Sequence, residues 1–247
     1  MKIAIISDLH SNLEALTAVR DHALARNVGR FICLGDCVGY GADPAATLDL
    51  LLSLPGLVSV IGNNDEYVVA PGLGEFPNEW IRQSAEWTRR QLCKAHFDWL
   101  GSLTYLHVED GVTYTHASAH DSNRWPYVTD VSQARACLKV AITDVVFIGH
   151  VHIPYVFEMA GHKGEITRHL AKAGDEVSFR AGSRYVVCVG SVGQPRDGDP
   201  RASYAIYDAG ERSVRFERVS YDQHSAAGKI RNAGLASVFA DRLYSAR

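Results

Sequence analysis

Acidic, amide and imidazole side chains recur in the first 152 residues, each of them directly after a short apolar run typical of a buried strand. Taken singly, an aspartate or asparagine after a strand is more simply explained as a turn residue. Taken together, oxygen and imidazole donors are the groups that bind divalent transition metals, and seven of them suffice for two ions when one carboxylate bridges. The sequence therefore predicts a two-metal centre, with the candidate ligands Asp8, His10, Asp36, Asn63, His116, His150 and His152.

The elements that must position these residues alternate between strand and helix. Three buried strands are predicted, at residues 2–7, 30–35 and 56–62. A helix is predicted after each of the first two, and the capping-box spacing of Ser11 and Glu14 predicts that the first helix starts at Ser11. This β-α-β-α-β order favours a parallel sheet, and ligand sites in such sheets lie beyond the carboxyl ends of the strands. Polar residues at separate strand ends are therefore expected to converge.

The rest of the chain predicts further short strands and helices, with no internal repeat and no clear linker. In order, these are an irregular segment at 65–78, one helix carrying Trp80, Trp87 and Trp99, a hairpin turning at Asp110-Gly111, a helix at 130–141, a strand at 144–152 and a last helix from near Asp222. We expect one domain over residues 1–247, with a candidate substrate-rim insertion at 65–100.

The composition favours a cytoplasmic protein that handles small ligands. A net charge of −3 argues against binding of long nucleic acid, while a small phosphate-bearing ligand stays open because a metal can supply positive charge. The five cysteines are odd in number and show no CxxC spacing, which favours free thiols in a reducing cytoplasm. No apolar stretch approaches the roughly 20 residues of a membrane-spanning helix, so no membrane partner is expected. A homo-oligomer is left open.

The order of the motifs resembles a known family. D-x-H at Asp8, G-D at Asp36, G-N-x-D at Asn63, a strand-end histidine at His116 and G-H-x-H at His150 together resemble the calcineurin-like metallophosphoesterase superfamily. The stretches "GDCVGYGADP" (35–44) and "GSVGQPRDGDPRASYAIYD" (190–208) resemble its bacterial phosphodiesterase-like branch. The resemblance implies an α/β protein built as a four-layer α/β/β/α sandwich with a two-metal site at its top.

The resemblance also implies which residues bind each metal. Asp8, His10, Asp36 and His152 correspond to the ligands of the first ion, and Asp36, Asn63, His116 and His150 to those of the second. Asp36 would bridge, and a hydroxide shared by the two ions would attack phosphorus in line. The mixture of oxygen and nitrogen ligands suits manganese or iron best, with zinc as an alternative.

One position departs from the family pattern. Most members carry a histidine after the metal-binding asparagine, and it is thought to protonate the leaving group, held by the following acid; this chain has Asn64 followed by Asp65. An amide can donate a hydrogen bond to a phosphate but cannot act as a general acid. Three interpretations follow. The protein could act on substrates with good leaving groups, such as phosphodiesters or phosphoanhydrides, or His120 could replace the missing acid. Alternatively, the protein could be a module that binds metal without turnover. The complete ligand set argues against the last.

A second departure concerns the residues expected to contact substrate. Relatives often have H-G-S-P-R where this chain has residues 116–120 without an arginine, so Arg124 or Arg196 is expected to contact the phosphate instead. The segments 65–78 and 117–128 are predicted to form a substrate rim. Trp125 and Tyr127 could stack on a base, although packing is the simpler explanation. The expected activity is hydrolysis of small, nucleotide-like diesters or anhydrides with weak phosphomonoesterase activity; a general phosphomonoesterase or protein phosphatase is the alternative.

Overall fold

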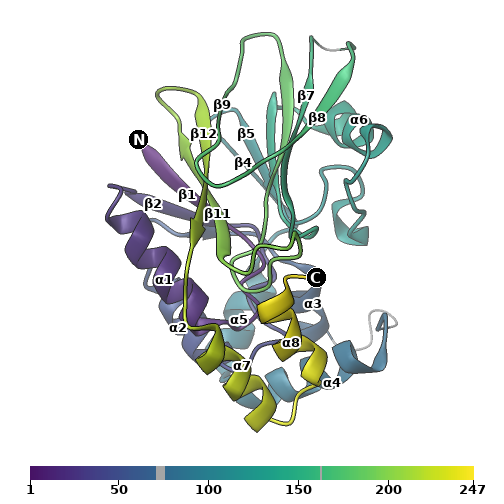
Figure 1. The fold of residues 1–247 in the computed structure, drawn as a ribbon. Coiled ribbons are helices and arrows are strands. Elements are labelled where there is room, and N and C mark those ends of the chain that lie inside the picture. Colours follow the sequence, from purple (N-terminus) through teal and green to yellow (C-terminus); the bar gives the residue numbers. More distant parts are fainter. Residues whose placement is uncertain (71–75, 162) are drawn as a thin grey trace.

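Two mixed β-sheets lie face to face in the computed structural model of the protein, which describes residues 1–70, 76–161 and 163–247 (Figure 1). The first sheet has the order β3-β2-β1-β11-β12-β9, and the second has the order β4-β5-β6-β10-β7-β8. The strands of the first sheet are β1 (Lys2–Ile6), β2 (Arg30–Cys33), β3 (Val58–Ser59), β9 (Glu176–Ser178), β11 (Ala202–Asp208) and β12 (Ser213–Val219). Those of the second are β4 (Leu106–Glu109), β5 (Val112–Thr115), β6 (Val145–Ile148), β7 (Pro154–Met159), β8 (Ile166–Leu170) and β10 (Arg184–Val189).

Helices cover the outer faces of both sheets, so the sandwich has the four α/β/β/α layers that the resemblance implies (Figure 1). The helices are α1 (Leu13–Leu24), α2 (Pro44–Leu52), α3 (Asn63–Val69), α4 (Glu79–Gln91), α5 (Lys94–Ser102), α6 (Val131–Val140), α7 (Gln223–Asn232) and α8 (Ser237–Ser245). Leu16 of α1 and Leu48 of α2 pack on the first sheet, and Leu138 of α6 packs on the second. Between the sheets, Ile5 and Phe147 belong to a continuous buried apolar cluster. Burial of these faces is the main stabilising contribution to the sandwich.

The parallel arrangement predicted for the first three strands is confirmed. Strand β1 pairs in parallel with β2, and β2 pairs in parallel with β3. In the second sheet, β6 pairs in parallel with β5 and with β10. The carboxyl ends of these strands meet at the same end of the sandwich, above the helices at the bottom of Figure 1. None of the helices in the described residues is long and apolar enough to cross a membrane.

Some local predictions are wrong. The segment predicted to be irregular from residue 65 begins as helix α3, which starts at Asn63 because Asp65 reaches back to the backbone N–H of Gly62; residues 71–75 of that segment lie outside the described residues. Helix α1 is capped by the side chain of Asn12, not by Ser11. The predicted single tryptophan-bearing helix is α4 and α5, and the predicted last helix is α7 and α8.

The two sheets approach so closely at their carboxyl ends that glycine is required after β6. A Cβ atom on Gly149 would lie 1.8 Å from Ser7 Oγ and 2.6 Å from Asp8 Oδ2, both of which follow β1 of the other sheet. No real Cβ atom has such contacts, so a larger residue would push the sheets apart at this point. Close packing of the two sheets thus explains why the first residue of the G-H-x-H motif is glycine.

We expect Gly149→Ala to lower the free energy of unfolding by about 1–3 kcal/mol, the usual consequence of overpacking. Gly101→Ala in α5 is the matched control, since a Cβ there meets nothing within 4 Å and alanine favours a helix. Urea denaturation of the metal-free proteins measures both changes. Equal stability of the two variants would show that the sheets tolerate a wider separation.

Candidate metal centre

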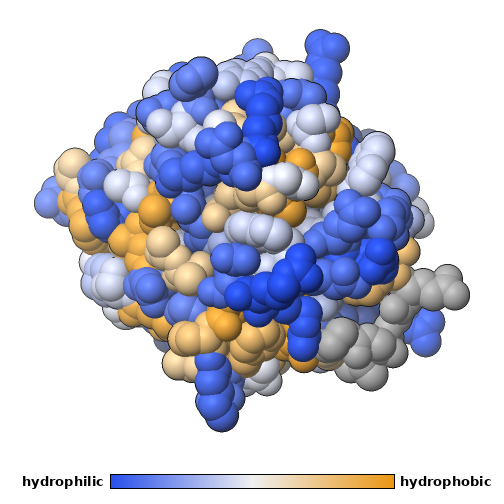
Figure 2. Space-filling view, turned by 90° about the horizontal axis from the view of Figure 1, so that it is seen from below, coloured by the Kyte–Doolittle hydropathy of each residue, from blue (hydrophilic) through white to orange (hydrophobic). Residues whose placement is uncertain are grey.

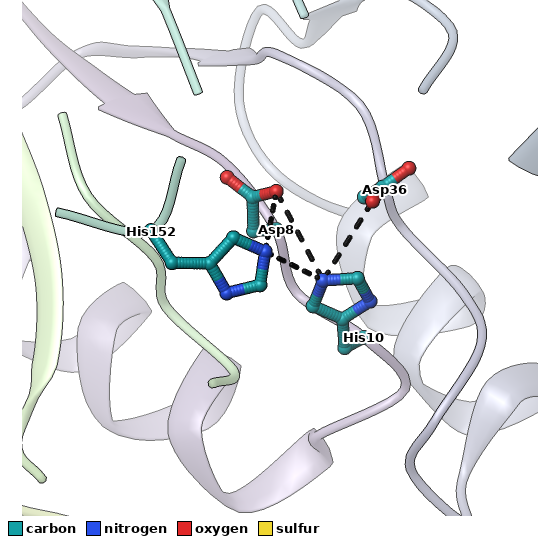
Figure 3. A group of neighbouring side chains, drawn as sticks. All are labelled: Asp8, His10, Asp36 and His152. Carbon is teal, nitrogen blue, oxygen red and sulfur yellow. Dashed lines mark hydrogen bonds and ion pairs between the residues drawn. The ribbon is translucent and has the colours of Figure 1, made fainter. Parts of the chain in front are cut away.

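Four of the predicted ligands meet in one buried cluster, which we call the first cluster (Figure 3). It consists of Asp8, His10, Asp36 and His152, and one ligand atom from each lies within 4.8 Å of the others. His152 Nε2 lies 3.1 Å from Asp8 Oδ1 and 3.2 Å from His10 Nε2. His10 Nε2 lies 3.7 Å from Asp36 Oδ2. The side chains come from the ends of β1, β2 and β6, and therefore from both sheets.

The other three predicted ligands lie around the same Asp36 carboxylate and form, with it, the second cluster. His116 Nε2 lies 3.5 Å from Asp36 Oδ2, 3.2 Å from Asn63 Oδ1 and 3.1 Å from His150 Nδ1. His116 Nε2 is also 4.0 Å from Asp8 Oδ1, so the two clusters adjoin. The structure thus brings all seven predicted side chains together, with Asp36 Oδ2 facing a histidine of each cluster.

Backbone carbonyls fix the orientation of two of the imidazoles. His152 Nδ1 lies 2.5 Å from the carbonyl oxygen of Gln194, and His116 Nδ1 lies 2.8 Å from that of Leu34. Each Nδ1 must donate its proton to the carbonyl, so in the neutral imidazole each Nε2 presents a lone pair to the cluster. A backbone acceptor behind the ring is how proteins orient metal-binding histidines.

Several hydrogen-bond acceptor atoms of the candidate ligands therefore point at one another in the centre. In the neutral imidazoles, His152 Nε2 faces Asp8 Oδ1 and His116 Nε2 faces the Asn63 carbonyl oxygen, so acceptor meets acceptor. The nearest ring donors to these two atoms are His10 Nε2 at 3.2 Å and His150 Nδ1 at 3.1 Å. Asp8 Oδ1 and His150 Nε2 are buried and have no hydrogen-bond partner in the described part of the chain. Buried acceptors without donors are costly. Divalent cations would relieve this arrangement, and the donor set fits them.

Burial and mutual charge shift the pKa values of these groups. Burial lowers the pKa of His10, His150 and His152 and so favours their neutral, metal-binding form. Burial alone would raise the pKa of Asp8, but its histidine neighbours, His152 foremost, outweigh burial and hold it below its ordinary value. Burial raises the pKa of Asp36, and the charge of Asp8 adds to this effect. Two carboxylates in one buried site favour a cation between them.

The backbone is strained where the ligands are held. Five of the seven residues have positive φ values although none is glycine: Asp8 (54°), His10 (48°), Asp36 (52°), His150 (65°) and His152 (63°). Such conformations are rare outside glycine and persist only where the surrounding structure imposes them. Strain concentrated at one constellation is typical of a functional site.

Asn64 and Asp65 hold the shared carboxylate and its loop in place. Asn64 donates from its backbone N to Asp36 Oδ1 at 2.8 Å and from Nδ2 to Asp36 Oδ2 at 2.7 Å. Asp65 accepts from the backbone N–H groups of Val38 and Gly62 at 3.1 and 3.0 Å. Burial, and then the charge of Asp36, raise the pKa of Asp65 to about 7. Asp65 therefore ties together the loops that follow β2 and β3.

A polar cavity of about 440 Å³ opens beside the two clusters. This size lies within the range of about 300–1,000 Å³ that is usual for small-molecule sites. Its walls include Asp36, Asn63, Asn64, His150 and His152, the predicted substrate residues Arg124 and Arg196, and Tyr40, Tyr67, Pro77, Asn78, Ile81, Trp125, Tyr127 and Arg242. A ligand in the cavity would therefore contact both the metal-binding residues and two predicted arginines.

Two aromatic residues of the wall have packing roles, as the sequence favoured. Trp125 Nε1 donates to Glu66 Oε2 at 3.1 Å, and its ring meets that of His116 edge-on. The ring of Tyr127 stacks on His150 with centroids 4.2 Å apart. The half-exposed Tyr127 also leaves part of its ring open to the cavity.

His120 does not reach the cavity. Its side chain is 46% exposed, and its Nδ1 lies 3.7 Å from Asp121 Oδ2 on the surface. Sequence reasoning missed Tyr40 and Arg242, which do line the cavity. Tyr40 follows the G-D motif by four residues and is 7% exposed, whereas Arg242 lies in α8, far from every motif. Only the proximity of Tyr40 to Asp36 in the sequence could have indicated a role.

Comparison with known proteins places the chain in a family. Residues 1–212 match the family model described as the calcineurin-like phosphoesterase superfamily domain. The uncharacterised protein MJ0912 of Methanocaldococcus jannaschii is 34% identical over 99% of this chain and 98% of its own. The chain belongs to the calcineurin-like phosphoesterase superfamily, whose members use divalent metal ions.

Solved structures agree with this assignment. The crystal structure of a metallophosphoesterase from Sphaerobacter thermophilus is 34% identical, with a TM-score of 0.90 over 100% of this chain and 99% of that one. The hypothetical protein PH1004 from Pyrococcus horikoshii shares the fold at 17% identity, with a TM-score of 0.80 over 100% of this chain and 98% of that one. Family and fold together support a metal-dependent phosphoesterase.

We expect Mn²⁺ to raise the melting temperature of the protein, because an ion bound only to the folded state at about 100 times its dissociation constant contributes about 2.7 kcal/mol. Asp36→Asn should lose most of this shift and most of the bound metal, measured by thermal unfolding and elemental analysis. The control is Asp98→Asn, whose carboxylate is 63% exposed on α5. Normal metal content in Asp36→Asn would disprove a shared ligand at this position.

Proposed function

We propose that the protein is a two-metal phosphoesterase that hydrolyses phosphodiester or phosphoanhydride bonds of small, nucleotide-like substrates. Asp8, His10, Asp36 and His152 would hold one ion, and Asp36, Asn63, His116 and His150 the other. The observation that carries the proposal is the pair of clusters around Asp36 Oδ2, which faces His10 Nε2 at 3.7 Å and His116 Nε2 at 3.5 Å. Manganese or iron suits this mixture of carboxylate, amide and imidazole ligands best, and zinc is the alternative.

Divalent ions in this site would supply the nucleophile by acidifying water and would neutralise charge on the phosphoryl oxygens. The chain supplies the positioning. Asn64 fixes the Asp36 carboxylate with two hydrogen bonds, and it also lines the cavity, where an amide can donate to a phosphate oxygen. Arg196 and Arg124 face the same cavity and offer charged donors to the substrate.

The cavity wall supports the preference for good leaving groups. Its only histidines in the described residues are His150 and His152, and both are assigned to metal. His120 lies at the surface beside Asp121 and is not among the cavity-lining residues, which argues against it as the replacement acid. Because general acid catalysis typically contributes 10²–10⁴-fold, monoesters with poor leaving groups should be slow substrates.

The rim of the cavity would select the substrate. Within the region 65–100 proposed as a rim insertion, Tyr67, Pro77, Asn78 and Ile81 line the wall, and Trp125 belongs to the second rim segment. The cysteines support a reducing, cytoplasmic environment, since all five are free and only Cys93 is exposed.

With Mn²⁺, we expect the protein to hydrolyse bis(p-nitrophenyl) phosphate at least about 10-fold faster than ethyl phosphate, judged by kcat/KM, because p-nitrophenolate departs without a proton whereas an alkoxide needs general acid help. Release of p-nitrophenol measures the first reaction, and release of inorganic phosphate measures the second. Equal rates would refute the interpretation of Asn64, and no turnover of either ester would favour a binding module instead of an enzyme.

Asn64→His should raise the kcat of the protein for a phosphomonoester with an alkyl leaving group, by about 10-fold or more, because an imidazole can protonate the leaving oxygen. Asn64→Ala is the control, since it removes the same hydrogen bond to Asp36 without adding an acid. The elemental content of bound metal is measured in both variants. If both variants behave alike, the missing acid does not limit monoester hydrolysis.

A further inference from the structure

Arg242 of helix α8 lies in the wall of the cavity. This helix is outside the part of the chain that the family model matches. The match ends at residue 212, and α7 and α8 span Gln223–Asn232 and Ser237–Ser245. These two helices form a hairpin at the bottom of the molecule in Figure 1, close to α3 and α4. Seen from below, this end carries strongly hydrophilic side chains between apolar patches (Figure 2). Arg242 is therefore part of the site although it is outside all five motifs.

A continuous stack of rings connects this hairpin to the first cluster. The ring of Tyr40 lies 4.3 Å from that of His10 on one side and 4.7 Å from that of Phe239 in α8 on the other, with interplanar angles of 24° and 19°. Phe239 and Tyr40 belong to the same buried apolar cluster as Leu243. The position of α8, and with it of Arg242, is thus fixed relative to the metal-binding residues.

Polar contacts hold the hairpin at two further points. Lys229 Nζ in α7 lies 2.6 Å from both Asp43 Oδ2 and Glu14 Oε1, next to the start of α2 and α1. After α8, the carbonyl oxygen of Ala246 accepts from the backbone N of Gly198 at 3.0 Å, in the loop that carries Arg196. The hairpin contacts the sandwich at several places. Helix α8 is therefore held in place, and Arg242 has a defined position in the cavity wall.

Three arginines around the cavity have no acidic partner. Within the described residues, Arg124, Arg196 and Arg242 form no ion pair, whereas Arg30, Arg82, Arg201 and Arg218 pair with carboxylates elsewhere. Arg196 Nε is buried and has no hydrogen-bond partner in the same part of the chain. Arg196 and Arg242 line the same cavity. Burial, and then the charge of Arg196, lower the pKa of Arg242. Like charges kept together without a counter-charge favour an anionic ligand.

The charge around the cavity exceeds what one phosphodiester needs. Two divalent ions with their shared hydroxide would leave a surplus of one positive charge over Asp8 and Asp36, and the three arginines add three more. A simple phosphodiester carries one negative charge at neutral pH, whereas a polyphosphate chain carries one or more on each phosphate. Guanidinium groups bind phosphate oxygens through charge-assisted, bidentate hydrogen bonds. The surplus therefore suits a substrate with further phosphates beyond the one attacked.

We propose that Arg242, with Arg196 and Arg124, forms a subsite for the phosphates next to the scissile one, so that the preferred substrate is a phosphoanhydride of the dinucleoside polyphosphate class. This inference rests on the proposed function and narrows its substrate. Hydrolysis breaks one P–O bond of the anhydride, and the bridging oxygen leaves with the distal phosphate. Water supplies a hydroxyl group to the attacked phosphorus and a proton to the solvent. The leaving phosphate needs no general acid, in agreement with Asn64.

The test compares Arg242→Gln with Arg231→Gln, a control on the neighbouring helix whose arginine makes an exposed pair with Asp241. Each Mn²⁺-loaded variant is assayed with diadenosine tetraphosphate and with bis(p-nitrophenyl) phosphate. We expect Arg242→Gln to lower kcat/KM for the tetraphosphate by about 10–100-fold, as for loss of a charged hydrogen bond, and to lower that for the aryl diester by a clearly smaller factor, because this substrate has no second phosphate. Arg242→Lys should restore part of the loss, and Arg231→Gln should match the unmodified protein.

A binding measurement separates failure of this inference from failure of the proposed function. Calorimetry of the Mn²⁺-loaded protein with methylenediphosphonate, which cannot be hydrolysed, should show affinity that falls about 10-fold in Arg242→Gln, while the affinity for inorganic phosphate stays unchanged. Turnover of neither substrate would overturn the proposed function, and the diphosphonate result would still decide on the subsite. Equal loss on both substrates, or diphosphonate binding that is unaffected by Arg242→Gln, would overturn the subsite.

Discussion

The position of the Asp36 carboxylate is the constraint to which the rest of the site is fitted. Oδ2 lies between histidines that come from both sheets, and Asn64 holds both of its oxygens with donors at 2.8 and 2.7 Å. This arrangement requires close approaches that the motif glycines permit. Between the sheets, a Cβ on Gly149 would lie 2.6 Å from Asp8 Oδ2, and within the first sheet, a Cβ on Gly62 would lie 2.2 Å from Asp36 Oδ1. The position of the Asp36 carboxylate therefore depends on the motif glycines, on the strained backbone at the ligands and on the contact between the two sheets.

In the proposed function, Asn64 stands where the resemblance implies a histidine, and it would position the carboxylate without supplying a proton to the leaving group. An amide gives a donor to Asp36 at any pH, because it does not titrate. It gives up the proton that a histidine could deliver to a departing alkoxide. Phosphoanhydrides lose least by this exchange, since the departing phosphate is already stable as an anion. The residue at position 64 and the arginines of the cavity thus favour the same kind of substrate for independent physical reasons.

Much of this arrangement could be predicted from the sequence because its signals are local. A short apolar run followed by a ligand residue indicates a strand and its carboxyl end, and the order of such runs indicates a parallel sheet. Helix α3 could not be predicted in the same way, since Gly62-Asn63-Asn64 has the composition of a turn and the helix depends on Asp65 reaching back to Gly62. The location of His120 could not be predicted from its proximity to His116 in the sequence, since its imidazole lies at the surface beside Asp121.

Arg242 shows why the substrate side of such a site resists prediction from sequence. Its helix has an ordinary apolar face, and its position at the cavity depends on the stack of Phe239, Tyr40 and His10, which joins residues more than two hundred positions apart. Metal ligands must lie at strand ends, where the sheet defines the geometry, and this keeps them within recognisable motifs. Residues that contact the outer parts of a substrate can come from any segment that packs on the rim. A common metal centre can therefore be combined with different substrates by changing what packs against Tyr40 and the rim, without changing any ligand.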